Sequence, residues 1–416
     1  MTHRSSIAAA LGGWSARYRI IALFGVVVVV AVPGLGRVAA QARSADPRRG
    51  TVVSFQQVAH LSLKQARRYQ QAVGFGSPAA RYGVDIYRIV YRTISEQGRP
   101  DTASGVLALP AGPQRVLRVV EFEHGTMVAK ADAASVAPGD RGEVVLIAGA
   151  GYAAVEPDYL GLGAGPGHHP YVDPVSEATA SVDMLRAVKV VAAHERRRLD
   201  PTILVTGFSQ GGQAAMATAR ALQQGAGGHL RLGAVAAISG PYDLLRVELP
   251  AGLDGTLNPK DMTFYLGYWV TSMNRFHHLY TDPGQVFRAP YDTTVPRLYN
   301  GYHSDHQVYV GIPASPEQLF TPAFLNQLAH PRGEMLRLLR ADDTTCTSWM
   351  PHVPVRLYAA HADTQVAYLN SVHCQRALAT HGLHVPLIDV GNVDHFPSEH
   401  LALPRVVRWF EELQPA

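Results

Sequence analysis

The sequence predicts an α/β protein with a mostly parallel central sheet, helices on both of its faces and an inserted helical cap. Three observations support this prediction. Strand-like apolar runs alternate with helical stretches between residues 115 and 244, with short connections. One of these runs leads into a glycine-rich turn and a helix at residues 207–212. From residue 245 to residue 340 the apolar spacing is helical, and the stretch is too long for a loop.

These patterns divide the chain of 416 residues into four segments. Residues 1–42 are expected to form a signal peptide, residues 43–244 and 341–416 two parts of one core, and residues 245–340 the cap between them. The length would allow two or three domains, but α/β folds with insertions often reach it as one unit.

Within the core, residues 54–73 predict a helix on the surface, because their apolar spacing is accompanied by Gln, Lys and Arg. Residues 82–94 alternate between two faces and are rich in Val, Ile and Tyr, which predicts a strand. Together with residues 104–109 they are expected to form an antiparallel pair at the edge of the sheet. Further strands are expected at residues 115–122, 203–206, 232–238, 353–359 and 385–390.

The N-terminal segment has the three parts of a secretory signal peptide. Arginines precede an apolar run at residues 20–32, Pro33-Gly34 ends that run, and small residues surround a cleavage site after Ala40 or Ala42. The run is short for a membrane span, although an uncleaved N-terminal anchor is the alternative. The four arginines of residues 1–42 account for the whole net charge of +4, so nothing in the mature chain favours nucleic-acid binding.

The candidate nucleophile is Ser209, in the turn Gly207-Phe208-Ser209-Gln210-Gly211-Gly212. A nucleophile elbow places its serine at the apex of a strained turn between a strand and a helix, and residues two positions away must be small. Gly207 and Gly211 meet this requirement. An ordinary glycine-rich turn is the alternative, but the flanking strand and helix favour the elbow.

The candidate base and acid are His395 and Asp363, each expected just beyond a strand. A serine hydroxyl needs a base to take its proton, and a carboxylate on the other ring nitrogen fixes the histidine tautomer. The order serine, acid, histidine is that of α/β-hydrolases. Asp389 is a rival acid, whereas Asp394 is adjacent to His395 and cannot readily fold back onto its ring.

The oxyanion of an acyl-transfer intermediate would be held by two backbone amides. The residue after the nucleophile, Gln210, supplies one, and the loop His124-Gly125-Thr126 after a strand would supply the other from Thr126. A simple tight turn at His124-Gly125 is the alternative. No metal and no cofactor is expected, because His168-His169 lacks a second pair of ligands at a suitable spacing.

Two further groups of residues are candidates for supporting roles. Cys346 and Cys374 are expected to form a disulfide in an exported protein, and two buried free thiols are the alternative. In the cap, aromatic residues lie four apart on a helix and form part of its core or of an acyl-binding pocket. These residues are Phe264, Tyr265, Tyr268 and Trp269.

The chain resembles the secretory lipases, the extracellular α/β-hydrolases that include lipase A-type enzymes. The resemblance rests on several blocks in one order: His124-Gly125-Thr126, residues 157–163, His169-Pro170-Tyr171, residues 207–212, residues 240–244 and Trp349-Met350-Pro351. It implies ester hydrolysis through an acyl-enzyme, with a helical cap forming the acyl site. The chain departs from the family pattern His-Gly-x-x-Asp-x-x-Val-Pro, because Ala359-Ala360 stands for His-Gly and Ala367 for the proline, and Phe396 stands where glycine is frequent.

The sequence therefore predicts a secreted carboxylic ester hydrolase, a lipase or esterase, acting on a small-molecule or lipid ester. Triacylglycerol is one candidate substrate. An acyltransferase on the same fold is the main alternative, and a serine peptidase or a non-catalytic binding protein is disfavoured. Transient contact with a lipid interface is compatible with this prediction, and no obligate protein partner is indicated.

Overall fold

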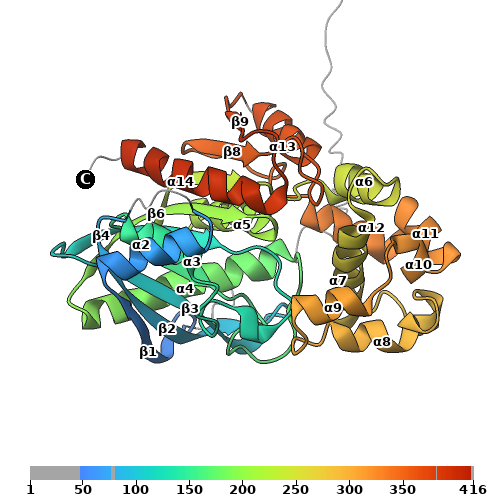
Figure 1. Ribbon diagram of the computed structural model, residues 1–416, viewed down its shortest axis with the longest axis horizontal. Helices are drawn as coiled ribbons and strands as arrows, with labels where there is room; N and C mark the ends of the chain where they lie inside the picture. The colour runs from blue at the N-terminus through green and yellow to red at the C-terminus, as the bar shows by residue number, and fades with distance from the viewer. Residues whose placement is uncertain (1–46, 76–79, 381, 414–416) are drawn as a thin grey trace, which may run out of the picture. The chain divides into compact units, whose positions relative to one another are not determined.

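The computed structural model describes residues 47–75, 80–380 and 382–413. The predicted signal peptide, residues 1–42, lies outside the described residues. Within these residues the strands form one nine-stranded sheet in the order β1-β2-β3-β5-β4-β6-β7-β8-β9 (Figure 1). The pairs β1–β2, β2–β3 and β3–β5 are antiparallel, and the five pairs from β5–β4 to β8–β9 are parallel. The predicted α/β class with a mostly parallel sheet is confirmed.

Apart from β1 and β5, each strand overlaps a predicted one. Their bounds are β1 (Val52–Leu61), β2 (Gly83–Ile94), β3 (Pro100–Ala111), β4 (Val116–Glu123), β5 (Ala153–Pro157), β6 (Arg198–Phe208), β7 (Arg231–Ile238), β8 (Val355–Ala359) and β9 (Leu387–Asp389).

The prediction of one surface helix over residues 54–73 is wrong in its first half. Residues 52–61 form the edge strand β1, antiparallel to β2, and only α2 (Leu63–Ala72) is helical. The pairing of β1 with β2 shifts register between Val52 and Ser54 and again between Gln57 and Ala59. Each irregularity adds a residue to the period of two, so the apolar spacing imitates a helix.

Helices cover both faces of the sheet. One face packs against α2, α3 (Gly142–Gly149) and α14 (His395–Leu413), and the other against α4 (Pro174–His194), α5 (Gln210–Gln223) and α13 (Leu369–Ala379). Alternate residues of β7 enter the two layers: Ala236 packs with α14, and Val235 and Ala237 pack with α5 and α13. A strand buried on both faces is apolar throughout, which explains the continuous runs in the sequence.

The stretch between β7 and β8 is helical and has its own hydrophobic core. Its longest helix, α7, begins at Pro259 after Asn258, whose side chain accepts hydrogen bonds from the amides of Lys260 and Asp261. The cap elements are η2 (Leu244–Glu248), α6 (Leu249–Leu253), α7 (Pro259–His277), η3 (Pro283–Gln285), α8 (Tyr291–Leu298), α9 (Asp305–Gly311), α10 (Pro316–Leu319), α11 (Pro322–Ala329) and α12 (Gly333–Asp342).

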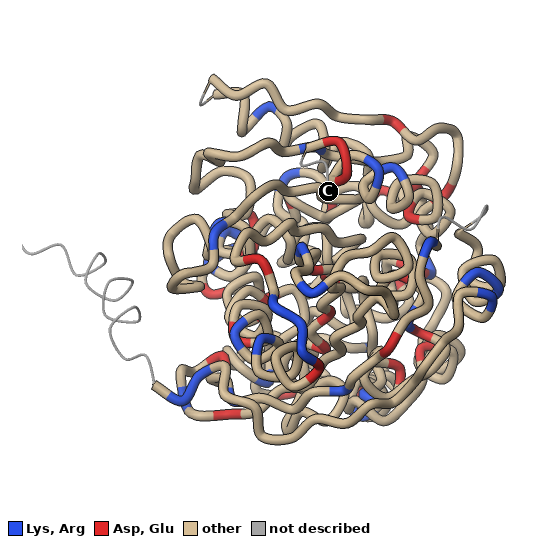
Figure 2. Tube along the Cα trace, turned by 90° about the vertical axis from the view of Figure 1, so that its left-hand side faces the viewer, with Lys and Arg blue, Asp and Glu red and all other residues tan. Residues whose placement is uncertain are grey.

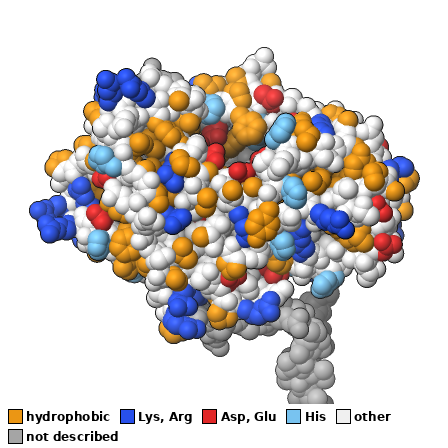
Figure 3. Space-filling model, turned by 60° about the horizontal axis from the view of Figure 1, so that its bottom comes forward, with side chains coloured by type: hydrophobic (Ala, Val, Ile, Leu, Met, Phe, Trp, Pro, Cys, Tyr) orange, Lys and Arg blue, Asp and Glu red, His pale blue; other side chains and the backbone are white. Residues whose placement is uncertain are grey.

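Acidic and basic residues are interspersed along the chain (Figure 2). On the face shown in Figure 3, hydrophobic side chains are scattered among polar ones. No helix in the described part of the chain has the length and apolar character that crossing a membrane requires.

Candidate active site

Ser209 occupies the turn between β6 and α5, with φ 58° and ψ −125°. Such a positive φ is strained for a residue with a side chain, so the surroundings must hold it in place. The Ser209 amide donates to the Ile238 carbonyl at 2.9 Å. A Cβ on Gly207 would lie 2.2 Å from the Gly211 carbonyl oxygen, and one on Gly211 would lie 1.9 Å from that of Glu123. Only glycine fits at these two positions.

Ser209, His395 and Asp363 form a continuous chain of hydrogen bonds. Ser209 Oγ lies 2.8 Å from His395 Nε2, and His395 Nδ1 lies 2.7 Å from Asp363 Oδ2. With its proton on Nδ1, the ring donates to Asp363 and accepts from the serine hydroxyl. The other oxygen of Asp363 accepts from the amides of Gln365 and Val366, both at 2.9 Å. All three triad side chains are buried.

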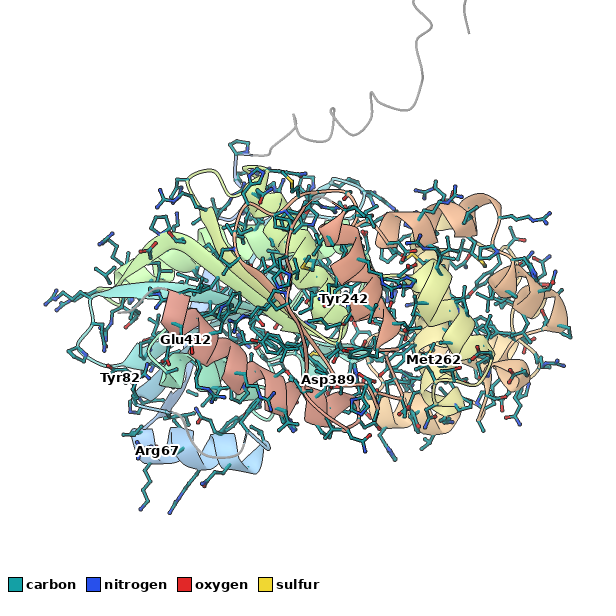
Figure 4. All side chains as sticks on the ribbon, turned by 90° about the horizontal axis from the view of Figure 1, so that it is seen from above. Arg67, Tyr82, Tyr242, Met262, Asp389 and Glu412 are labelled. Carbon is teal, nitrogen blue, oxygen red and sulfur yellow. A yellow bond between two sulfur atoms is a disulfide. The ribbon has the colours of Figure 1, made fainter. Side chains whose placement is uncertain are left out.

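The rival carboxylates face other partners. Asp389, at the end of β9 (Figure 4), lies 2.7 Å from Nδ1 of His361. Asp394 accepts from the amide and hydroxyl of Thr364, both at 2.9 Å. Of the three candidates, Asp363 is therefore the one whose carboxylate contacts the ring of His395.

Thr126 and Gln210, expected to supply the oxyanion amides, lie beside Ser209 and line one cavity with it. Thr126 Oγ1 lies 2.9 Å from the hydroxyl of Tyr171. The Gln210 side-chain amide donates to Glu177 Oε1 at 2.6 Å and to His169 Nε2 at 2.9 Å. These contacts anchor both residues through their side chains.

Burial disfavours the charged forms of His169 and Glu177, the two groups that hold the Gln210 side chain. Burial lowers the pKa of His169 to about 3, and it raises the pKa of Glu177 well above its usual value. The sequence placed His169 in a loop beside the site but gave no sign of this contact. Among the described residues, no group of three or more His, Cys, Asp or Glu side chains is arranged to hold a metal ion.

An apolar cavity of ≈ 70 Å³ opens beside Ser209 under the cap. Its wall combines residues of η2, α6, α7 and α12, including Leu244, Leu249, Met262 (Figure 4), Leu266 and Leu339. One carboxyl group, Glu248, also lines it and accepts from the Asn370 side-chain amide at 2.6 Å and from the Ala367 amide at 3.1 Å. Burial raises the pKa of Glu248 to about 8, so at neutral pH it is mostly uncharged.

The four aromatic residues of α7 divide into two pairs. Tyr265 and Trp269 line the apolar cavity. Phe264 and Tyr268 do not line it: Tyr268 stacks on Tyr171 at 4.2 Å between ring centroids, and Phe264 packs in the cap core, the other role expected for these residues. On a helix, positions 264 and 265 differ by about 100° in direction, so adjacent residues enter different environments.

A second cavity of ≈ 340 Å³, called the polar cavity because its wall is more polar than that of the first, opens on the other side of Ser209. Its wall also includes apolar side chains, among them Phe122, Phe208 and Phe396. It shares Ser209, Thr126 and Tyr265 with the apolar cavity, and His395 lines only the polar one. Its polar wall includes His124, Glu143 of α3, Glu156 of β5 and Glu399 of α14. Two cavities of different polarity therefore share Ser209.

Cys346 and Cys374 are joined by a disulfide. Cys346 follows the last cap helix, α12, and Cys374 lies in α13 of the core. The segment between them contains β8 and Asp363. The disulfide thus ties down both ends of the segment that carries the acid.

Comparisons with known proteins identify the fold. No family model matches the chain, and no curated protein matches it. The rice cell wall degrading esterase LipA from Xanthomonas oryzae superposes with a TM-score of 0.78 and 26% identity, covering 88% of this chain and 98% of that one. Candida antarctica lipase A in its closed state has a TM-score of 0.61 and 15% identity, over 88% and 82% of the two chains. The chain therefore has the α/β-hydrolase fold, and its structural neighbours include an esterase and a lipase A, as the resemblance implied.

Proposed function

We propose that this protein is a serine hydrolase that cleaves carboxylic esters through an acyl-enzyme on Ser209. The observation that carries the proposal is the hydrogen-bonded chain from the Ser209 hydroxyl through His395 to Asp363. The structural likeness to an esterase and a lipase supports ester hydrolysis over other reactions of this fold.

In the first half of the reaction, Ser209 Oγ attacks the ester carbonyl carbon and His395 Nε2 takes the hydroxyl proton. The carboxylate of Asp363 stabilises the imidazolium, and the amides of Thr126 and Gln210 hold the negative carbonyl oxygen. The carbon–oxygen bond to the alcohol then breaks, and the imidazolium returns its proton to the leaving alkoxide. Water then attacks the acyl-enzyme while His395 takes a proton from it. The imidazolium returns this proton to Ser209 Oγ, which releases the acid and restores the serine.

The acyl group belongs in the apolar cavity, because its wall offers a hydrocarbon chain contacts that water does not. Tyr265 and Trp269 are its aromatic walls beside the serine. The cavity is small, at ≈ 70 Å³, so short acyl groups are the preferred substrates.

The test is hydrolysis of p-nitrophenyl esters with acyl chains from two to sixteen carbons, by the mature protein and by Ser209→Ala. We expect Ser209→Ala to lose at least ~10⁴-fold in kcat, because no other hydroxyl replaces the nucleophile. Equal rates for both proteins would remove the proposal.

We also propose that the protein is exported after cleavage of residues 1–42. The disulfide supports this proposal, because such bonds persist in oxidising compartments. The N-terminal sequence of the protein recovered outside the cell should begin at residue 41 or 43, and an intact Met1 would contradict cleavage.

A further inference from the structure

The polar cavity beside Ser209 has no role in the chemistry described above, although it is larger than the apolar one, at ≈ 340 Å³ against ≈ 70 Å³. An ester placed for attack has two sides, and the acyl side occupies the apolar cavity if the proposed function holds. The question is therefore what kind of alcohol the polar cavity accepts.

The position of His395 decides which side of the ester enters this cavity. Its ring must protonate the leaving oxygen, so that oxygen must lie on the side of the serine where the ring is. His395 lines the polar cavity and not the apolar one. The alcohol portion of the ester consequently extends into the polar cavity.

Two residues that line this cavity carry buried polar atoms without partners in the described part of the chain. His124 is 3% exposed and Glu156 is 1% exposed. His124 Nδ1 lies 2.7 Å from the Gly125 carbonyl oxygen and donates to it, so the free Nε2 is an acceptor. Neither His124 Nε2 nor Glu156 Oε2 has a hydrogen-bond partner among the described residues. A buried polar atom left without a partner is unfavourable, so both residues favour a hydrogen-bonding occupant.

The third group is Glu399, which follows His395 by one helical turn on α14 and is 7% exposed. Residues four apart share a helix face, so Glu399 lies behind His395 along the wall. Glu143 reaches the same cavity from α3. The wall thus offers hydrogen-bonding groups at several points beyond the leaving oxygen.

Burial favours the uncharged forms of these groups. Burial, together with the nearby carboxyl groups, raises the pKa of Glu156 and Glu399 well above the usual value. Burial lowers the pKa of His124 to about 4 and raises that of Glu143 to about 7. Carboxyl groups and an imidazole whose charged forms are disfavoured by burial suit neutral hydroxyl groups, which both donate and accept, better than they suit a cation.

We propose that the polar cavity binds the alcohol portion of the ester, and that this alcohol is neutral and carries further hydroxyl groups that hydrogen-bond to His124, Glu156 and Glu399. The substrate class is then an ester of a polyol with a short acyl chain. This inference rests on the proposed function, since it assigns the second half of the same substrate.

The experiment compares three butyrate esters that share one acyl group: ethyl butyrate, glyceryl monobutyrate and butyrylcholine. Acid release in a pH-stat gives kcat/KM for each. We expect the wild-type protein to prefer glyceryl monobutyrate over ethyl butyrate by about three- to tenfold, the ratio that one additional neutral hydrogen bond supports. Butyrylcholine should not exceed glyceryl monobutyrate.

Variants of α14 connect the preference to the cavity. Glu399→Leu removes the polar group at similar volume and should bring the glyceryl-to-ethyl ratio close to one. Glu399→Gln keeps an uncharged hydrogen-bonding group and should retain most of the ratio. The matched control is Glu412→Leu, on the same helix but exposed (Figure 4), which should leave the ratio unchanged.

The possible outcomes separate this inference from the proposed function. A wild-type ratio of one or below, or a ratio that Glu399→Leu leaves unchanged, would overturn the inference while Ser209-dependent cleavage of ethyl butyrate stands. A preference for butyrylcholine would show a cation site and overturn it too. If folded wild-type protein cleaves none of the esters, both proposals fail. The wild-type comparison decides the matter even if a variant does not fold.

Discussion

Replacing Gly211 by alanine tests whether the turn at Ser209 is as tightly enclosed as the structure indicates. The added Cβ would lie 1.9 Å from the Glu123 carbonyl oxygen and 2.5 Å from that of His124. Ordinary contact begins at 3.4 Å, so α5 and the end of β4 must separate by roughly 1.5 Å. Both obstacles are backbone atoms, which cannot turn aside as a side chain would.

Two magnitudes follow from that displacement. Overpacking costs about 1–3 kcal/mol, and the upper end applies here because backbone must move. With an unfolding entropy of about 2.1 cal/mol/K per residue over roughly 370 residues, about 3 kcal/mol lowers Tm by about 4 °C. A displacement above about 1 Å at the nucleophile costs at least ~10²-fold in kcat.

The assay combines thermal unfolding with the steady-state hydrolysis of p-nitrophenyl butyrate. The control is Gly284→Ala, where the added Cβ would make only ordinary contacts of 3.4–3.8 Å with Asp282. Gly211→Ala should lose both stability and activity, and Gly284→Ala neither. A Gly211→Ala protein with wild-type Tm and kcat would refute the reasoning about the elbow.

Three further predictions concern the acid, the pH dependence of stability and the disulfide. Asp363→Asn should lower kcat for p-nitrophenyl butyrate by about 10⁴-fold because the amide favours the wrong tautomer of the ring, whereas Asp389→Asn should stay near wild type; the reverse result would exchange the acids. In thermal scans the wild-type Tm should fall between pH 6.5 and pH 8, and the Tm of Glu248→Gln should fall less over the same range. An equal dependence of Tm on pH in both proteins would contradict the raised pKa of Glu248. The double variant Cys346→Ser/Cys374→Ser should lose about 3–4 kcal/mol in urea unfolding, and reduced wild-type protein should match it; a change below about 1 kcal/mol would contradict this expectation.

The pH prediction depends on the signs of two opposing effects. The pKa of Glu248 rises from 4.5 to about 8 on folding, so its contribution to stability is complete below pH 4.5 and is lost as the pH rises through 8. The pKa of His124 falls from 6.5 to about 4, so its effect is a gain in stability from pH 4 to pH 6.5, with no change above. Between pH 6.5 and pH 8 the carboxyl effect is therefore unopposed, at most about 1.4 kcal/mol per pH unit.

Most of the parallel core could be predicted because its strands are buried on both faces and therefore apolar throughout. The edge strand β1 could not, since most of its side chains are exposed and irregular pairing with β2 disrupts its alternation. An exposed strand is defined by the partner it pairs with, which a local pattern does not contain.

The candidate triad was predictable because its geometry follows from strand order: each of Ser209, Asp363 and His395 follows a strand of one parallel sheet. The contact between Gln210 and Glu177 was not, because a single buried glutamate in an apolar helix carries no mark of its partner. The polar cavity was missed for a related reason. Glu143, Glu156 and Glu399 come from three elements far apart in sequence, and only the fold brings them together.

The apolar and polar cavities share Ser209, so the site distinguishes the two orientations in which an ester could bind. Glyceryl butyrate and butyl glycerate contain the same groups with the carbonyl carbon exchanged between them. In glyceryl butyrate, the hydrocarbon chain points to the apolar cavity and the hydroxyl groups point to the polar cavity. In butyl glycerate, productive attack would place the butyl chain in the polar cavity and the hydroxyl groups in the apolar cavity. The difference in polarity between the two cavities would then make the protein cleave glyceryl butyrate in preference to its isomer butyl glycerate.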